Sequence, residues 1–188
     1  DSPRVPEAAQ RLREVQEYLA DADAEVASFY ATHQNWAATI ARYQTVADTY
    51  PLYSHMDDVL IGLGDAYEAE ARYYRSLKQL PEASRAQLIK INEEQAAAAY
   101  RKVILEHSAA PHVEDARDRL AAMDLPIPTP TPEQAAASAA LENSRGQYTL
   151  AKRLSVFVLH QPLPVTAFRS STATRISASR SGCEIVPT

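Results

Sequence analysis

The sequence is poor in cysteine, glycine, tryptophan and phenylalanine. Its 188 residues include one Cys, four Gly, one Trp and three Phe. The single cysteine, Cys183, can form neither an internal disulfide nor a cysteine-based zinc site. Few glycines and abundant alanine favour helices over sheets, because alanine has the highest intrinsic helix propensity. The composition therefore favours an all-α fold without an internal disulfide.

Long apolar runs and excess positive charge are also absent. No segment approaches the roughly 18 apolar residues that a bilayer-spanning helix needs. The net charge of −5 and the pI near 5.5 disfavour nucleic acid as a partner, because nucleic-acid binding needs a basic surface. The hydrophobic content of 46% is ordinary for a folded protein of one or two domains.

Patterns typical of enzymes and metal sites are missing as well. There is no Gly-rich phosphate loop and no Gly-x-Ser-x-Gly motif. The five histidines form no His-x-x-x-His pair, and no carboxylate joins two of them at ligand spacing. Glu93 and Glu94 are adjacent on a predicted helix, so they diverge and cannot act as a facing acid pair. We expect no cofactor, no metal and no catalytic residues.

What the sequence does contain is a repeated spacing of aromatic and small residues. The offsets are those of the tetratricopeptide repeat, a helix–turn–helix unit of about 34 residues. Such units stack into a solenoid that holds other proteins. The first set of repeat positions comprises Val26, Ala27, Tyr30, Thr39, Tyr43 and Pro51, and the second comprises Leu63, Gly64, Tyr67, Ala96 and Tyr100. Gly64 is expected to let the neighbouring helix approach closely.

Apolar residues at steps of three and four predict the first helical hairpin. A stripe in the first helix, which should run to about residue 32, is expected to bury one face. The second helix should present an apolar face of its own and end before Pro51. The stripe consists of Leu12, Val15, Leu19, Ala22, Val26 and Phe29, and the second face of Trp36, Ile40, Tyr43 and Val46.

The second repeat contains a long insertion. Tyr30 and Thr39 are nine residues apart, whereas Tyr67 and Ala96, the equivalent pair, are 29 apart. With a turn near Pro81, about ten extra residues would lengthen each helix by roughly 15 Å. We therefore predict an extended hairpin over about 57–107 that projects from the solenoid, followed by a capping helix that carries Val113 to Met123.

The chain thus divides near residue 125. Residues 1–125 are predicted to form the helical repeat domain. Residues 126–188 read as a Pro-rich linker, a short Ala-rich helix at about 133–141 and a basic, Ser/Thr-rich tail that we expect to be disordered.

Residues 5–123 resemble the C-terminal repeats of the BamD family, the outer-membrane assembly lipoproteins of Gram-negative bacteria. The resemblance is carried by the long helix before EVASFY, the NW pair after the turn, IARYQTVADTYP and the terminal VEDARDRLAAM. Three features depart from the family: the long insertion, Thr39 in place of the usual Ala, and the basic tail. The N-terminal repeats and lipidated cysteine expected of a full-length member are not in this chain.

The resemblance implies a scaffold on the periplasmic face of the outer membrane. It would bind the POTRA domains of BamA, and further partners would be other BAM lipoproteins and unfolded outer-membrane proteins. Membrane association would depend on an N-terminal lipid anchor. Arg42 occupies the basic position at which the family contacts BamA, and because Tyr43 should face the core, the Arg42 guanidinium should project outward to bind a carboxylate.

The other candidate contact residues could instead serve to pack the helices. Trp36 is either a packing residue or an interface anchor, and of Tyr73 and Tyr74 one should pack within the hairpin while the other is an exposed contact. The sequence-based hypothesis is therefore a non-enzymatic assembly scaffold. A generic peptide-binding repeat module is the alternative, although the acidic residues near the inner face (Asp23, Glu25, Asp65 and Glu68) suit a peptide carboxylate poorly.

Overall fold

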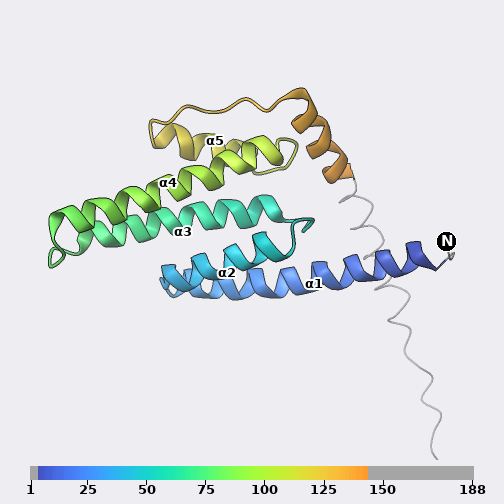
Figure 1. Ribbon diagram of the computed structural model, residues 1–188, viewed down its shortest axis with the longest axis horizontal. Coiled ribbons are helices and arrows are strands. Elements are labelled where there is room, and N and C mark those ends of the chain that lie inside the picture. Colours follow the sequence, from blue (N-terminus) through green and yellow to red (C-terminus); the bar gives the residue numbers. More distant parts are fainter. Residues whose placement is uncertain (1–3, 144–188) are drawn as a thin grey trace, which may run out of the picture.

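The computed structural model describes residues 4–143, and within this range the protein is all-α (Figure 1). The Asn35 side chain caps the N-terminus of the second helix by accepting a hydrogen bond from Ala38 N (3.3 Å). The labelled helices are α1 (Val5–Thr32), α2 (Trp36–Thr49), α3 (Met56–Ser76), α4 (Glu82–Glu106) and α5 (Val113–Ala122), and a further helix covers 132–143.

The helices form a layered stack with a tetratricopeptide-like arrangement. Helices α1 and α2 form one antiparallel hairpin, and α3 and α4 form a second, longer one. Helix α2 packs on both α1 and α3, and α5 packs mainly on α4 (Figure 1). The predicted fold class, an all-α stack of helical hairpins, is confirmed.

The apolar core lies between α2, α3, α4 and α5. Its largest fully buried side chains include Tyr100 and Ile104 on α4, Leu60 on α3 and Leu120 on α5. The second set of repeat positions lies in this core: Leu63, Gly64, Tyr67, Ala96 and Tyr100 are all buried. Burial of these side chains holds the second hairpin and α5 together as one unit.

The α3–α4 hairpin is the extended element that the insertion predicts. Its helices contain 21 and 25 residues, against 14 in α2. Pro81 is the residue before α4, with φ of −53° and ψ of 137°, so it ends the turn and starts the second helix. The far end of the hairpin projects beyond the other helices, at the left of Figure 1.

The apolar stripe of α1 is not buried, which contradicts the sequence-based prediction. Leu19 is 45% exposed, and four further members of the six are exposed to between 39% and 59%. Helix α1 instead packs through small residues on a different face, where Ala20 and Ala27 are fully buried and Ala24 touches the core. Small side chains let α1 and α2 approach closely, so the large apolar residues are left at the surface. Besides Leu19, the exposed large residues of the stripe are Leu12, Val15, Val26 and Phe29.

The segment after α5 folds back along the molecule. Residues 125–131 are extended, and Thr131 and Gln134 then form a reciprocal capping box that starts the helix at 132–143. The buried Ser138 hydroxyl of this helix accepts a hydrogen bond from Ala109 N in the α4–α5 turn (2.9 Å). The predicted disorder of the basic tail concerns residues that lie outside those described.

Candidate partner-binding surface

Arg42 lies on the solvent-exposed side of α2 and is the only cationic residue of that helix. Among residues 4–143, no hydrogen bond or ion pair engages its guanidinium. The next residue, Tyr43, turns inward, and its ring lies against Gly62 of α3, where an added Cβ would be 2.9 Å from Tyr43 Cε2. The predicted outward projection of Arg42 thus follows from the inward packing of its neighbour.

Helix α2, which carries Arg42, is held in place by a contact with α3 and by a hydrogen bond at its own N-terminus. Gln44 Nε2 donates to the Tyr67 hydroxyl on α3 (2.6 Å). Thr39, which replaces the usual alanine, is fully buried and donates its hydroxyl to the Asn35 carbonyl at the start of the helix (2.9 Å). The position of Arg42 relative to α3 is therefore set before any partner binds.

Trp36 is half-buried at the start of α2 and packs against the core. Together with Tyr43 it forms the aromatic wall of a groove of about 520 Å³ between the end of α1, α2, α3 and α5. The groove floor consists of small residues such as Ala66 and Gly62. Trp36 therefore packs on the core and also faces a groove, and its role as an interface anchor stays a prediction.

Charged residues at the rim of this groove neutralise one another. Arg119 on α5 contacts both oxygens of Asp65 (2.7 and 3.0 Å), and Arg72 pairs with Glu68 at 3.3 Å. The buried Tyr100 hydroxyl lies between the two carboxylates, at 2.8 Å from Asp65 and 2.9 Å from Glu68. Burial, with these carboxylates, raises the pKa of Tyr100, and the hydrogen bond to Asp65 raises the pKa of Arg119.

The inner face is therefore less acidic than the sequence suggests. Of the four acidic residues expected there, Asp65 and Glu68 line the groove, and each has an arginine partner. Asp23 and Glu25 are on α1 and do not line this groove. The charges on this face therefore disfavour a peptide carboxylate less than the sequence indicates.

Tyr73 and Tyr74 lie near the end of α3, on the projecting hairpin. Tyr73 is 53% exposed, whereas Tyr74 is half-buried and donates its hydroxyl to Glu70 (3.3 Å). Burial, together with Glu70, raises the pKa of Tyr74. Within the described part of the chain, no hydrogen bond or ring contact joins these tyrosines on α3 to Arg42 or Trp36 on α2.

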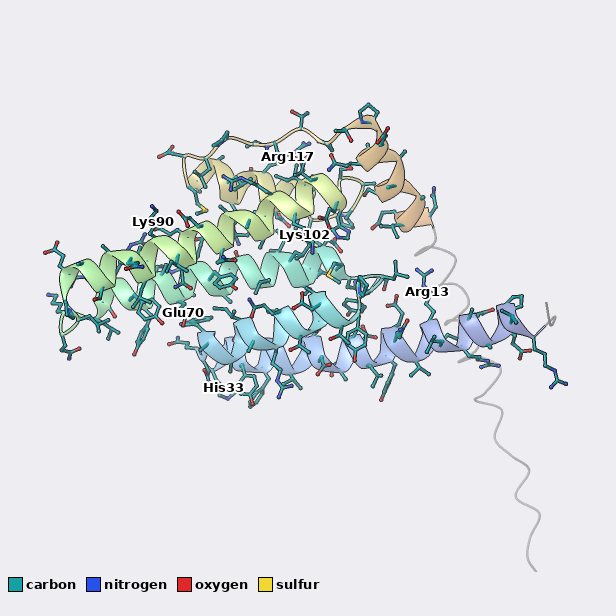
Figure 2. The ribbon with its side chains drawn as sticks, in the orientation of Figure 1. Arg13, His33, Glu70, Lys90, Lys102 and Arg117 are labelled. Atoms are coloured by element: carbon teal, nitrogen blue, oxygen red, sulfur yellow. The ribbon has the colours of Figure 1, made fainter. Side chains whose placement is uncertain are left out.

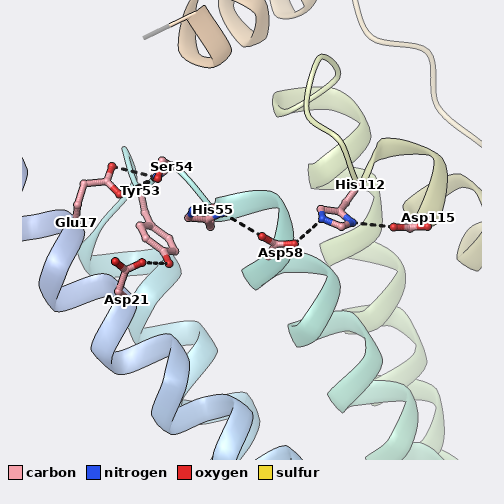
Figure 3. A network of polar contacts seen from close by, with 8 residues as sticks. All are labelled: Glu17, Asp21, Tyr53, Ser54, His55, Asp58, His112 and Asp115. Atoms are coloured by element: carbon pink, nitrogen blue, oxygen red, sulfur yellow. Dashed lines mark hydrogen bonds and ion pairs between the residues drawn. The ribbon is translucent and has the colours of Figure 1, made fainter. Parts of the chain in front are cut away.

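One cluster that the sequence argument excluded is present. Asp58 on α3 joins two histidines: its Oδ2 is 3.3 Å from His55 Nδ1, and its Oδ1 is 2.7 Å from His112 Nε2 (Figure 3). The expectation that no carboxylate joins two histidines at ligand spacing is therefore wrong. The reason is tertiary, because the turn before α5 returns His112 to the start of α3, which local sequence spacing cannot show.

The exposed stripe of α1 is a further surface that sequence reasoning missed, since the residues were identified but assigned to the core. No helix within residues 4–143 combines the length and the apolar character that a membrane span requires. The stripe forms one apolar face of α1, and polar residues surround it.

Part of the chain is similar to a known protein family. Residues 1–88 match YfiO, a family described as outer membrane lipoproteins. The matched segment contains α1, α2, α3 and the turn at the tip of the long hairpin, and it includes Arg42, Trp36, Tyr73 and Tyr74. No curated protein and no solved structure gives a significant match.

Proposed function

We propose that this protein is a non-enzymatic scaffold subunit of the outer-membrane β-barrel assembly machinery. It acts at the periplasmic face of the outer membrane and binds the POTRA domains of BamA. The family match over residues 1–88 supports the proposal, because the matched family consists of outer membrane lipoproteins and the matched segment carries the predicted contacts.

The observation that carries the proposal is the exposed Arg42 guanidinium on a fixed helix. An arginine whose guanidinium binds no group within residues 4–143 can offer two parallel N–H donors to a carboxylate of a partner. Because the contacts of Tyr43 and Gln44 fix α2 on α3, little backbone ordering remains for the binding step. In the proposed mechanism, a rigid helix therefore presents the Arg42 guanidinium to the partner without rearranging.

The projecting hairpin supplies a second contact in the same proposal. Tyr73 presents an exposed ring close to the hairpin end, and tyrosine is a frequent anchor at interfaces. This ring is suited to another lipoprotein of the same assembly, at a distance from the BamA contact. Two separate surfaces on one stack allow the protein to hold two partners at once.

The test is binding of the purified chain to the periplasmic domains of BamA from the same organism, measured by calorimetry. Arg42→Glu should weaken binding at least tenfold, or about 1.4 kcal/mol. The matched control is Lys78→Glu, which reverses one exposed charge at the tip of the hairpin. Circular dichroism establishes that each variant is folded. Wild-type protein that is folded and does not bind would refute the proposal.

The groove beside Trp36 favours a second candidate, a module that captures extended peptides. Its aromatic wall, small-residue floor and paired rim charges could take an apolar side chain flanked by polar groups. Trp36→Ala would then weaken binding of unfolded outer-membrane protein segments and leave BamA binding intact. If Arg42→Glu and Trp36→Ala both spare BamA binding while Trp36→Ala abolishes peptide binding, the peptide-binding module becomes the better description.

A further inference from the structure

Two distant parts of the chain meet where α3 and α5 begin. Asp57 and Asp58 are in the first turn of α3, and His112 is the residue before α5. Asp115, in the first turn of α5, lies on the other side of the imidazole (Figure 3). The α4 helix and its following turn separate the two groups in sequence, so the cluster exists only in the folded protein.

The side chains converge with the spacing of a ligand set. One ligand atom from each of Asp57, Asp58 and His112 lies within 4.8 Å of the others. His112 Nε2 is directed at Asp58 Oδ1 (2.7 Å), and the Asp57 carboxylate is almost fully buried, at 1% exposure. A cation at the point of convergence would be ligated by one oxygen of each carboxylate and by the imidazole nitrogen.

The imidazole is already oriented as in metal sites. His112 Nδ1 donates a hydrogen bond to Asp115 Oδ2 (2.8 Å). In metal proteins, a ligating histidine almost always donates its second ring N–H to a carboxylate, a carbonyl or water, which fixes the tautomer and turns the other nitrogen toward the ion. Asp115 thus holds the proton on Nδ1 and leaves Nε2 as the ligand atom.

We propose that Asp57, Asp58 and His112 bind a divalent transition-metal ion of the zinc type, with water as the fourth ligand. One imidazole nitrogen with two carboxylate oxygens matches the donors that Zn²⁺ accepts, whereas Mg²⁺ and Ca²⁺ prefer oxygen ligands throughout. In the absence of the ion, the same contacts form an ion-pair network in which a proton on Nε2 takes the place of the metal.

A bound ion would connect α5 to the base of the long hairpin. Because the ligands come from helices far apart in sequence, the ion would bind the folded chain far better than the unfolded one. A ligand that binds only the native state raises its stability by mass action. The metal would act as a structural clip that holds α5 against α3 and α4.

The test is calorimetric titration of the full chain with ZnCl₂ near neutral pH, combined with thermal unfolding. We expect binding of one ion and a rise in Tm of about 5 °C or more at saturating Zn²⁺. The variants His112→Gln and Asp58→Asn should each lose at least tenfold in affinity and most of the rise in Tm. Mg²⁺ and Ca²⁺ at the same concentrations should produce neither effect.

Two controls test other groups of the chain that can bind Zn²⁺. His33 lies in the α1–α2 turn (Figure 2), and His33→Gln should bind Zn²⁺ like the wild type. Cys183→Ser should do the same. Absence of Zn²⁺ binding by the folded wild type, or equal affinity in His112→Gln and Asp58→Asn, would overturn the proposal and leave an ion-pair network. The result for BamA binding is independent, because Arg42 is not part of this cluster.

Discussion

The ring of Tyr100 occupies the space that a side chain at Gly64 would need. A Cβ built on Gly64 would lie 2.4 Å from Tyr100 Cε1 and 2.6 Å from its Cζ. Tyr100 is fully buried, so its ring has no free volume into which to move. The close packing of α3 and α4 depends on this pair.

Gly64→Ala should therefore destabilise the protein. We expect the free energy of unfolding to fall by about 2 kcal/mol, because an overpacked core outweighs the roughly 1 kcal/mol that alanine gains in helix propensity. Gly62→Ala is the matched control, since the neighbouring Tyr43 ring is only half-buried and can rotate away. Urea unfolding of both variants gives the comparison, and a Gly64→Ala protein as stable as the wild type would show that the ring is not fixed.

The buried tyrosines should make the protein sensitive to alkali. Burial is the main factor that raises the pKa of Tyr53 and Tyr100 well above the ordinary value of 10. These groups stay protonated in the folded chain while their unfolded counterparts ionise, so their stabilisation is complete below pH 10 and declines above it. The free energy of unfolding should fall by up to about 1.4 kcal/mol per pH unit for each tyrosine.

Urea unfolding at pH 8 to 11 measures this slope. Tyr100→Phe should reduce the decline above pH 10, because one of the two groups is removed. If the slope in this variant equals that of the wild type, Tyr100 ionises as readily in the folded chain as in the unfolded one.

Glu17 should be a stability determinant although it is charged. Its carboxylate is 95% buried and accepts hydrogen bonds from Ser54 N (3.1 Å) and Ser54 Oγ (2.8 Å), which attach the α2–α3 turn to α1 (Figure 3). Glu17→Ala would leave the Ser54 groups without these acceptors and should cost about 1 to 3 kcal/mol. Glu25→Ala, at an exposed position of the same helix, should change stability by less than about 0.5 kcal/mol. Similar losses in the two variants would contradict this account.

Adjacent residues of α1 should respond in opposite ways to the same substitution. Val26 is 39% exposed and Ala27 is fully buried. Val26→Asn should cost less than about 1 kcal/mol, whereas Ala27→Asn places an amide in the α1–α2 contact and should cost about 3 kcal/mol. Thermal unfolding monitored by circular dichroism separates the two. A larger loss for Val26→Asn would restore the original assignment of the apolar stripe to the core.

The second hairpin could be predicted because its signals are local. The spacing from Tyr67 to Ala96 predicted the insertion, and Pro81 predicted the position of the turn. The pairing of Gly64 with Tyr100 also follows from repeat positions, since small and large residues are complementary where two helices cross closely. In each case, residue type and spacing are sufficient because the partner element is the next helix in the chain.

The α1 face and the histidine cluster could not be predicted in the same way. A hydrophobic period of 3.6 residues identifies an apolar face of a helix but does not say whether another element covers it. The face of α1 that is buried is a second one, formed by small residues such as Ala20 and Ala27. The contact between Asp58 and His112 depends on the path of the chain through α4 and its turn. Both features are properties of the assembled stack, and sequence spacing along one helix does not contain them.

The length of the α3–α4 hairpin implies that stability is unevenly distributed along it. Buried residues begin at Ala71 on α3 and Asn92 on α4, whereas the portion beyond them is largely exposed and projects past the neighbouring helices (Figure 1). Few buried contacts permit local opening without global unfolding. Amide hydrogen exchange should therefore quicken from base to tip, and uniform protection would contradict this. Such a hairpin can fray and re-form at its end, near Tyr73, while the stack that displays Arg42 stays intact.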